Sequence, residues 1–235
     1  MSDFLAQIPV RLRPTIKYFS TDMWDGYLTA VEEYIAAHAS ESLSRTAEVK
    51  ARLVVDRFHI AQHYREDFDD LRKQELKRLK KELPADTYDQ DCKSTLWLLR
   101  KNHASLDDED LLRLRRLLAH SAPLHLGYTL REEMTAIFNQ SQSRSAAQRR
   151  LNAWIRKVQD SNLDCFDGFI KTLSAHWQPI LNYFEERVTS GFVEGLNNKI
   201  KTLKRRCYGI KKVSTLFQRL WLDLEGRTRF FLSTP

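Results

Sequence analysis

The sequence predicts an α/β protein that is mostly helical and has a small parallel sheet. Two short segments, residues 16–20 and 52–55, have the apolar and aromatic composition of strands. A helical pattern separates them, and from residue 57 onward the apolar residues recur almost entirely at helical spacing. The order strand, helix, strand predicts a right-handed parallel crossover that leads into a long helical region.

Composition limits the possible classes of protein. The chain has 235 residues, is 42% hydrophobic and has a mean hydropathy of −0.51, which is enough for one good core. It has no stretch that would cross a bilayer, and we expect a cytoplasmic protein with no membrane partner. The net charge of +7 indicates that the binding partner is a polyanion such as nucleic acid. Cys92, Cys165 and Cys207 lie too far apart to indicate a disulfide framework or a structural zinc site.

The first strand follows a short lead-in of residues 1–14, whose final proline favours an extended chain after it. Asp22 lies just beyond the carboxyl end of this strand. The next segment, residues 24–38, is predicted to be a helix whose inner face carries Tyr27, Val31, Tyr34 and Ile35. Asp22 has a simpler interpretation as the N-cap of that helix, and Asp25 is a rival candidate for a site residue.

The second strand, residues 52–55, is continuously apolar, as strands buried on both faces are, and Asp56 ends it. Because the carboxyl ends of neighbouring parallel strands meet at one edge, we expect Asp22 and Asp56 to be near neighbours. Ligands of open α/β sheets bind at this edge.

A long helix is predicted over residues 57–83, where Pro84 stops it. Its apolar positions are Phe58, Ala61, Tyr64, Phe68, Leu71, Leu76, Leu79 and Leu83. Its second half is crowded with cations at Lys73, Lys77, Arg78, Lys80 and Lys81. These cations have two interpretations, a solvated helix face or a phosphate-binding surface.

Further helices are predicted along the rest of the chain. One begins with a cap at Ser105, and its acidic first turn precedes apolar positions at Leu111, Leu114, Leu117 and Leu118. Others are expected at about residues 128–139, 144–159 and 163–187, and Pro179 should kink or split the last of them. A final helix is expected over residues 213–229, with Leu216, Phe217, Leu220 and Leu224 inward.

The segment 190–209 reads as one helix with two chemically different faces. Thr189 or Ser190 can cap its start, and Gly209 suits the left-handed residue that ends a helix. Leu196, Ile200, Leu203 and Cys207 form an apolar stripe, and Glu194, Asn198, Lys201 and Arg205 repeat on the opposite side. The polar face could hold a metal ion at its acidic start and a phosphate backbone along the rest. The pattern of this helix alone favours a solvated face that complements the helix dipole, and the rest of the chain shifts the balance toward the metal and phosphate interpretation.

Four motifs carry a resemblance to a known family. They are Thr21-Asp-Met-Trp-Asp-Gly-Tyr27, Val55-Asp-Arg-Phe-His59, Leu181-Asn-Tyr-Phe-Glu-Glu-Arg-Val-Thr-Ser190, and Glu194-Gly-Leu-Asn-Asn-Lys-Ile-Lys201 running into Lys204-Arg-Arg-Cys-Tyr-Gly209. In this order and spacing the chain resembles the catalytic region of ISL3-type insertion-sequence transposases, which have an RNase H-like fold and an Asp, Asp, Glu active site.

The resemblance implies roles for individual residues. Asp22 matches the second catalytic aspartate and Glu194 the catalytic glutamate, so both would bind Mg²⁺ or Mn²⁺. Asp56 and His59 match a D-x-x-H element that supports the site, and Asp56 would not be a metal ligand. Residues implied to contact DNA lie on or after the basic helix: Asn198, Lys201, Lys204, Arg205, Arg206, Lys211 and Lys212.

The same resemblance predicts three segments. Residues 1–62 would be a partial RNase H-like core, 63–162 a helical insertion, and 163–235 the core helices that carry the glutamate. The family's first catalytic aspartate, zinc-binding segment and helix-turn-helix have no counterpart in the sequence. We therefore expect a chain that is inactive alone and prone to self-association through an exposed strand edge.

Two functions follow as hypotheses. The first is metal-dependent cleavage and strand transfer of DNA at element ends and target, by a homo-oligomeric transposase of which this chain is the catalytic region. The alternative is a non-catalytic fragment that binds DNA or regulates the transposase. Its DNA affinity would fall steeply with salt, without metal-dependent cutting.

Overall fold

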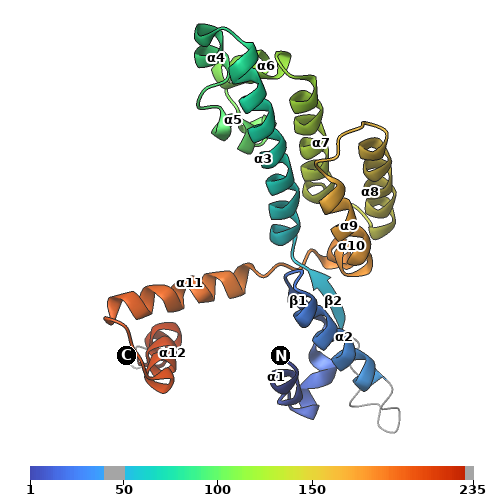
Figure 1. Ribbon diagram of the computed structural model, residues 1–235. Helices are drawn as coiled ribbons and strands as arrows, with labels where there is room; N and C mark the ends of the chain where they lie inside the picture. Colours follow the sequence, from blue (N-terminus) through green and yellow to red (C-terminus); the bar gives the residue numbers. More distant parts are fainter. Residues whose placement is uncertain (40–50, 231–235) are drawn as a thin grey trace. The chain divides into compact units, whose positions relative to one another are not determined.

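The computed structural model describes residues 1–39 and 51–230, and the chain divides into two compact units, Met1–Val188 and Thr189–Pro235. The first unit contains a two-stranded parallel sheet and most of the helices (Figure 1). This confirms the predicted α/β, mostly α fold class.

The sheet pairs β1 (Tyr18–Thr21) with β2 (Arg52–Val55), and α2 (Asp25–Ala39) lies between them in the sequence. The register aligns Tyr18 with Arg52 and Thr21 with Val55. The amide of Asp56 donates to the carbonyl of Thr21 at 3.0 Å, so pairing continues to the end of both strands. The lead-in is more ordered than expected, since it forms α1 (Ser2–Ala6) and the 3₁₀ helix η1 (Val10–Thr15).

The outer edge of β2 is covered by α10 (Trp177–Glu186). The side-chain amide of Asn182 donates to the carbonyl of Leu53 at 2.8 Å and satisfies a strand group that has no strand partner. Val54 and Val55 are completely buried, as the continuous apolar run predicted.

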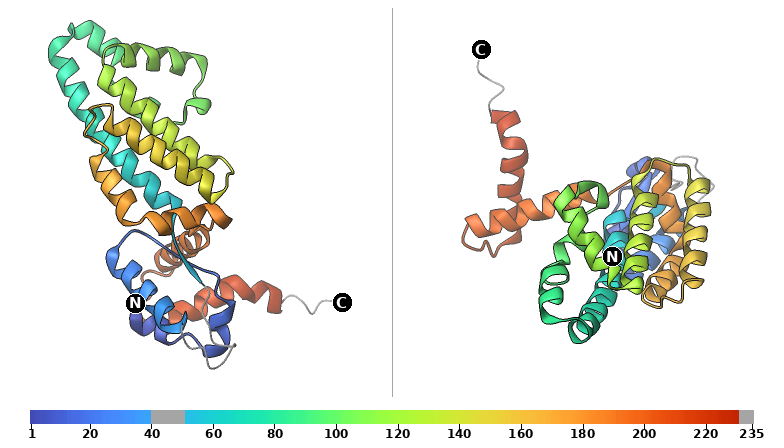
Figure 2. Two further views of the ribbon diagram at one scale, coloured as in Figure 1. Left: turned by 90° about the vertical axis from the view of Figure 1, so that its right-hand side faces the viewer. Right: turned by 90° about the horizontal axis from the view of Figure 1, so that it is seen from above.

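The helical region is built on α3 (Arg57–Glu82), which packs along α7 (Ala122–Asn139), and α7 packs against α8 (Arg144–Gln159) (Figure 2). A buried hydrogen bond of 3.0 Å joins the Tyr64 and Thr135 hydroxyls across α3 and α7. The indole N–H of Trp154 donates to the carbonyl of Leu130 at 2.8 Å and ties α8 to α7. These contacts give the buried hydroxyl groups of Tyr64 and Thr135 and the indole N–H of Trp154 their hydrogen-bond partners.

Shorter helices complete the first unit. They are α4 (Ala85–Asp91), α5 (Leu96–Arg100), the 3₁₀ helix η2 (His103–Ser105), α6 (Asp108–Ala119) and α9 (Asp167–Ala175). The predicted helix 163–187 is split into α9 and α10 at His176, three residues before Pro179. The expected break is therefore confirmed.

Two helix starts differ from the sequence prediction. The cap of α6 is Asp107, whose carboxylate accepts from the amide of Asp110 at 2.9 Å, and not Ser105. Helix α7 begins at Ala122, six residues earlier than predicted, because Ser121 caps it and Pro123 sits in its first turn. Ser followed by Pro at this spacing is a start signal that the prediction overlooked.

Several apolar residues predicted to face inward are exposed. Tyr27, on α2, and Phe58, on α3, are the two in the first unit. Phe217 and Leu224 are the two in the second unit. Helical spacing identified the correct faces of these helices, but it did not fix how wide the buried stripe of each helix is.

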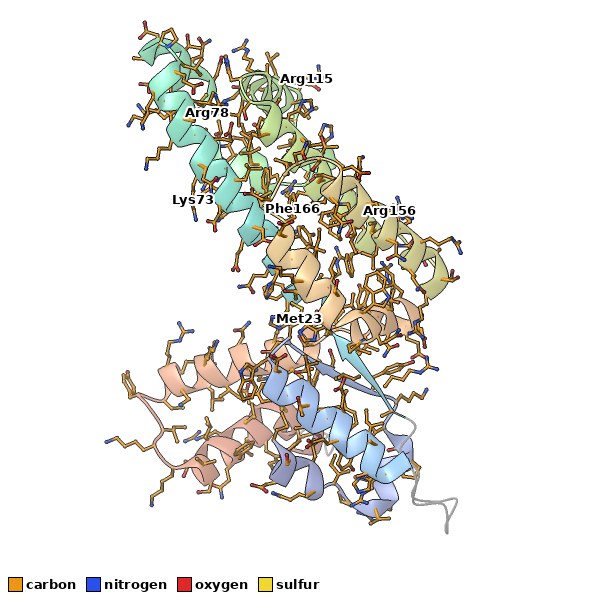
Figure 3. The ribbon with its side chains drawn as sticks, turned by 45° about the vertical axis from the view of Figure 1, so that its right-hand side comes forward. Met23, Lys73, Arg78, Arg115, Arg156 and Phe166 are labelled. Atoms are coloured by element: carbon orange, nitrogen blue, oxygen red, sulfur yellow. The ribbon has the colours of Figure 1, made fainter. Side chains whose placement is uncertain are left out.

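The cations of α3 behave mainly as a solvated helix face. Lys73 pairs with Asp70 at 2.8 Å, and Arg78 pairs with Glu75 at 2.7 Å and with Glu82. Figure 3 shows Lys73 and Arg78 projecting outward from α3, whereas Phe166 lies among the packed helices. Pairs at three- and four-residue spacing stabilise the helix itself.

The second unit consists of α11 (Gly191–Arg206) and α12 (Val213–Phe230). The two helices contact each other, and the ammonium of Lys199 pairs with Asp223 at 2.9 Å. The predicted stripe of Leu196, Ile200, Leu203 and Cys207 is half-buried on α11. Gly209, at φ +80°, adopts the predicted left-handed conformation, and Tyr208 precedes it at φ +51°.

Among the described residues, no helix has the length and apolar character that crossing a membrane requires.

Candidate functional site

Asp22 is held in a defined orientation at the carboxyl end of β1. Its Oδ1 atom accepts the amide of Trp24 at 3.2 Å and lies 3.4 Å from the Thr21 hydroxyl. Because α2 begins at Asp25, Asp22 closes the turn before the helix and is not its N-cap residue. The side chain is half-buried, and both of these hydrogen bonds are made by its Oδ1 atom.

Asp56 occupies the equivalent position at the end of β2. It is buried, and its Oδ1 atom accepts the amide of Phe58 at 2.8 Å as the N-cap of α3. Burial and capping give Asp56 a structural role that fixes the start of α3 at the sheet edge. The register of the strands therefore brings Asp22 and Asp56 to the same edge, as the sequence predicted.

His59 lies in the first turn of α3 and is half-buried. Its ring meets that of Phe58 edge to face, with centroids 5.5 Å apart and planes at 83°. Its amide bonds to the carbonyl of Asp56 at 3.1 Å, so the backbone links the two members of the D-x-x-H element. The neighbouring Arg57 side chain bonds to Asn139 of α7, which anchors this turn to the helical region.

Two exposed aromatic residues were not singled out as site residues by the sequence. Trp24 and Phe58 each stand two residues after an aspartate that ends a strand, and each donates its amide to that aspartate. Their side chains are 60% and 56% exposed. The repeated pattern Asp-x-aromatic was the available signal, and it was masked because Phe58 also fits the apolar spacing of α3.

Glu194 lies in the first turn of α11, in the second unit. The side chain of the N-cap residue Ser190 does not cap the helix. The amide of Glu194 donates to the carbonyl of Ser190 at 2.9 Å, and the Ser190 hydroxyl lies 3.5 Å from the Oε1 atom of Glu194. An acidic residue in a first turn interacts favourably with the helix dipole. Glu194 is exposed and available to a ligand.

The basic side chains implied to contact DNA are exposed. Four of them lie on α11: Lys201, Lys204, Arg205 and Arg206. Lys211 and Lys212 lie in the connection between α11 and α12. Asn198, also implied to contact DNA, is an exposed amide on α11. Lys199 differs because its ammonium is paired with Asp223, and this pairing lowers the pKa of the Asp223 carboxyl. Exposed cations at helical spacing suit contacts with successive phosphates.

The donor types fit a hard divalent cation only in part. Asp22 and Glu194 offer the carboxylate oxygens that Mg²⁺ and Mn²⁺ prefer. Within residues 1–39 and 51–230, however, no three His, Cys, Asp or Glu side chains form a group that could hold a metal ion. The first unit thus assembles Asp22, Asp56 and His59 around one sheet edge, and the second carries Glu194 and the basic face.

Comparison with known proteins gives a consistent result. Residues 1–220 match the model of an ISL3-type DDE family described as transposase. The chain is also 30% identical over 227 residues to the transposase for insertion sequence element IS1001 of Bordetella parapertussis. That alignment covers 96% of this chain and 52% of the relative, so the chain spans about half the relative's length. No solved structure matches the chain.

Proposed function

Because the chain belongs to the ISL3-type DDE transposase family, we propose that it contributes Asp22 and Glu194 to a metal-dependent site that cleaves DNA and transfers strands. The observation that carries this proposal is the position of Asp22. It stands where a parallel strand ends, beside the paired strand's Asp56, at the edge where open α/β sheets bind ligands.

We assign a separate role to each group of residues in this chain. Asp22 and Glu194 would hold Mg²⁺ or Mn²⁺, which when bound supplies Lewis-acid stabilisation of an in-line displacement at phosphorus. Asp56 would keep β2 and α3 in a fixed relation, and His59 would support the edge from the first turn of α3. Asn198, Lys201, Lys204, Arg205, Arg206, Lys211 and Lys212 would position the DNA backbone.

We also propose DNA as the partner, at element ends and at the target, and a homo-oligomer as the working form. The exposed cations of α11 support the DNA proposal. In the part of the chain that the structure describes, the outer edge of β1 has no paired strand, which supports association through that edge.

The test is cleavage by a complete transposase that contains these residues. Glu194→Gln and Asp22→Asn should each abolish metal-dependent cutting, while DNA binding stays nearly unchanged. Glu225→Gln, also exposed but on α12, is the control for the first variant. Asp25→Asn is the control for the second, because Asp25 is three residues from Asp22 and strongly exposed. Full cleavage by Glu194→Gln or Asp22→Asn would refute the assignment of that residue.

The second candidate is DNA binding without cleavage. It is favoured by the basic face of α11 together with the lack of a three-residue metal group among residues 1–39 and 51–230. The test is to measure binding of this chain to DNA at several salt concentrations and to look for cutting when Mg²⁺ or Mn²⁺ is added. Salt-sensitive binding without cutting would identify DNA binding as the activity of this polypeptide.

A further inference from the structure

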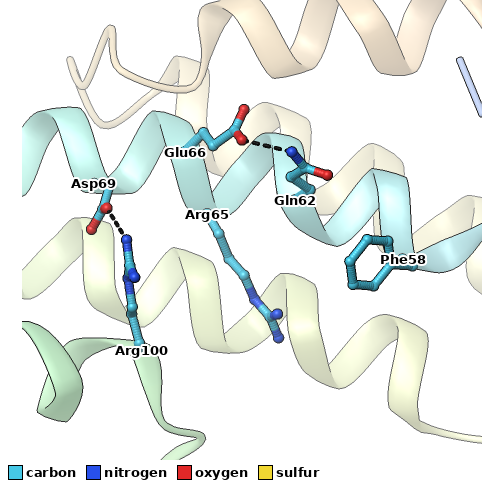
Figure 4. Close-up of a pocket in the computed structure, with 6 residues that line it drawn as sticks. All are labelled: Phe58, Gln62, Arg65, Glu66, Asp69 and Arg100. Carbon is cyan, nitrogen blue, oxygen red and sulfur yellow. Dashed lines mark hydrogen bonds and ion pairs between the residues drawn. The ribbon is translucent and has the colours of Figure 1, made fainter. Parts of the chain in front are cut away.

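An open hollow of about 290 Å³ lies along α3, next to the sheet edge (Figure 4). Four of its lining residues, Phe58, Gln62, Arg65 and Asp69, recur at three- and four-residue spacing and therefore share one face of α3. Glu66 completes that face, and Arg100 approaches from the end of α5. The first lining residue, Phe58, comes two residues after Asp56, so the hollow begins at the end of α3 that follows the sheet.

The polar groups of the hollow are mostly fixed in place. The guanidinium of Arg100 pairs with Asp69 at 2.6 Å, and Arg72 binds the same carboxylate at 3.0 Å. Burial opposes ionisation of Asp69, but these two bonds outweigh it and hold the pKa of its carboxyl below the ordinary value. The Gln62 amide donates to Glu66 at 2.8 Å. The exposed Arg65 extends between Phe58 and Arg100 (Figure 4).

This combination selects among ligand classes. A plain anion would gain little, because the two arginines are matched by two carboxylates. An apolar ligand would cover the charged side chains of the hollow without making hydrogen bonds to them. A nucleotide suits the hollow, since a base can stack on the exposed ring of Phe58, amide and carboxylate groups can meet its polar edge, and the guanidinium of Arg65 can meet its phosphate while Arg100 stays paired with Asp69.

We propose that this hollow binds one unpaired nucleotide of DNA, with its base stacked on Phe58, its base edge toward Gln62 and Glu66, and its phosphate held by Arg65. The inference rests on the proposed function, because it places this nucleotide next to the strand ends that carry Asp22 and Asp56. Arg57 takes no part, since its side chain is bound to Asn139.

The experiment is fluorescence anisotropy with the full chain at low salt and three labelled DNAs. These are a short single strand, the same backbone with abasic sites in place of the bases, and the corresponding duplex. Wild-type protein should prefer the base-bearing strand over the abasic strand by about 5- to 140-fold, the range expected for stacking of one base.

Two variants of Phe58 separate stacking from folding. Phe58→Ala should bind both single strands at the abasic level, and Phe58→Trp should keep the preference. Because Phe58 is largely exposed, neither change should disturb the core. Phe4→Ala is the matched control, as Phe4 is an exposed phenylalanine on α1. Arg65→Gln should weaken binding of both strands by the same factor, since it removes a phosphate contact.

The outcomes are distinct. An unchanged preference in Phe58→Ala, with normal binding of the duplex, would overturn the nucleotide site and leave the proposed function standing. An equal affinity of the wild-type protein for both strands would overturn it too. If wild-type protein binds none of the three DNAs, the proposed function and this inference fall together.

Discussion

The side-chain amide of Asn182 lies 2.8 Å from the main-chain carbonyl of Leu53 and closes the outer edge of β2. Leu53 is buried, so this carbonyl has exchanged water for one amide donor. In a two-stranded sheet, a side chain from a helix here takes the place of a third strand. The contact helps to fix β2, the strand that Asp56 directly follows.

The first prediction concerns this contact. Asn182→Ala should lower the free energy of unfolding by about 1–3 kcal/mol, the usual cost of leaving a buried carbonyl without a donor. Urea unfolding followed by circular dichroism measures the change. Asn152→Ala, at an exposed position of α8, is the control and should change stability by less than about 0.5 kcal/mol. Equal stability of both variants would show that water replaces the amide.

The second prediction compares two helical glycines. A Cβ atom at Gly127 would lie 2.5 Å from Cδ2 of Leu71 and 3.3 Å from the ring of Phe68, so α7 and α3 meet closely at this glycine. Gly127→Val should destabilise the protein by about 1–3 kcal/mol through overpacking. Gly195→Val should be neutral or slightly stabilising, because nothing lies within 4 Å of a Cβ there and valine is the better helix former. Thermal unfolding of both variants tests the contrast.

The third prediction concerns pH. Burial raises the pKa of Asp67 above its ordinary value, even though its carboxylate accepts the amide of Phe169 at 3.1 Å. The folded state therefore holds this proton more tightly than the unfolded state does. The contribution of Asp67 to stability is best below the ordinary pKa of 3.8 and is lost as pH rises through the raised value.

Asp67→Asn should remove that loss while keeping an acceptor for Phe169. The variant should be more stable than wild type at pH 7. Between pH 4 and neutrality, its free energy of unfolding should fall less than that of the wild type, because it has no carboxyl at this position to ionise. Asp67→Ala is the control, because it removes the acceptor as well and should be the less stable of the two. A wild-type pH profile in Asp67→Asn would contradict the prediction.

The fourth prediction concerns the basic face of α11. Replacing Lys201 and Arg205 together by glutamine should reduce the slope of log affinity against log salt by about 2 for duplex DNA, because each phosphate contact contributes about 0.9. Lys199→Gln should change the slope less, since its ammonium is already paired with Asp223. Anisotropy titrations over a series of salt concentrations measure both slopes. Identical slopes for the double variant and wild type would exclude these residues from the interface.

Local sequence signals predicted the sheet and its edge well. The strand 52–55 was predicted with its observed bounds, and β1 differs from its prediction by one or two residues, because short apolar runs between helical patterns leave few alternatives. Asp22 and Asp56 could be placed together because parallel pairing fixes where both strands end.

Other features depend on packing that spacing does not encode. Phe58 repeats with the core positions of α3, yet it is exposed, because it lies in the first turn of α3 directly after the end of β2. The hollow was not predicted because Arg100 reaches it from a separate helix, 31 residues after Asp69. Asp22 and Glu194 lie in different compact units, and helical or strand spacing within one unit carries no information about a residue in the other.

Helix α3 has a mechanical consequence. It begins at the buried cap Asp56 and runs without a break for 26 residues, a rod about 39 Å long at the usual rise per residue. The hollow occupies the base of this rod, and the ion-paired cations occupy its far half. Because α3 is one unbroken helix that also packs along α7, its length sets how far the distal helices stand from the sheet edge.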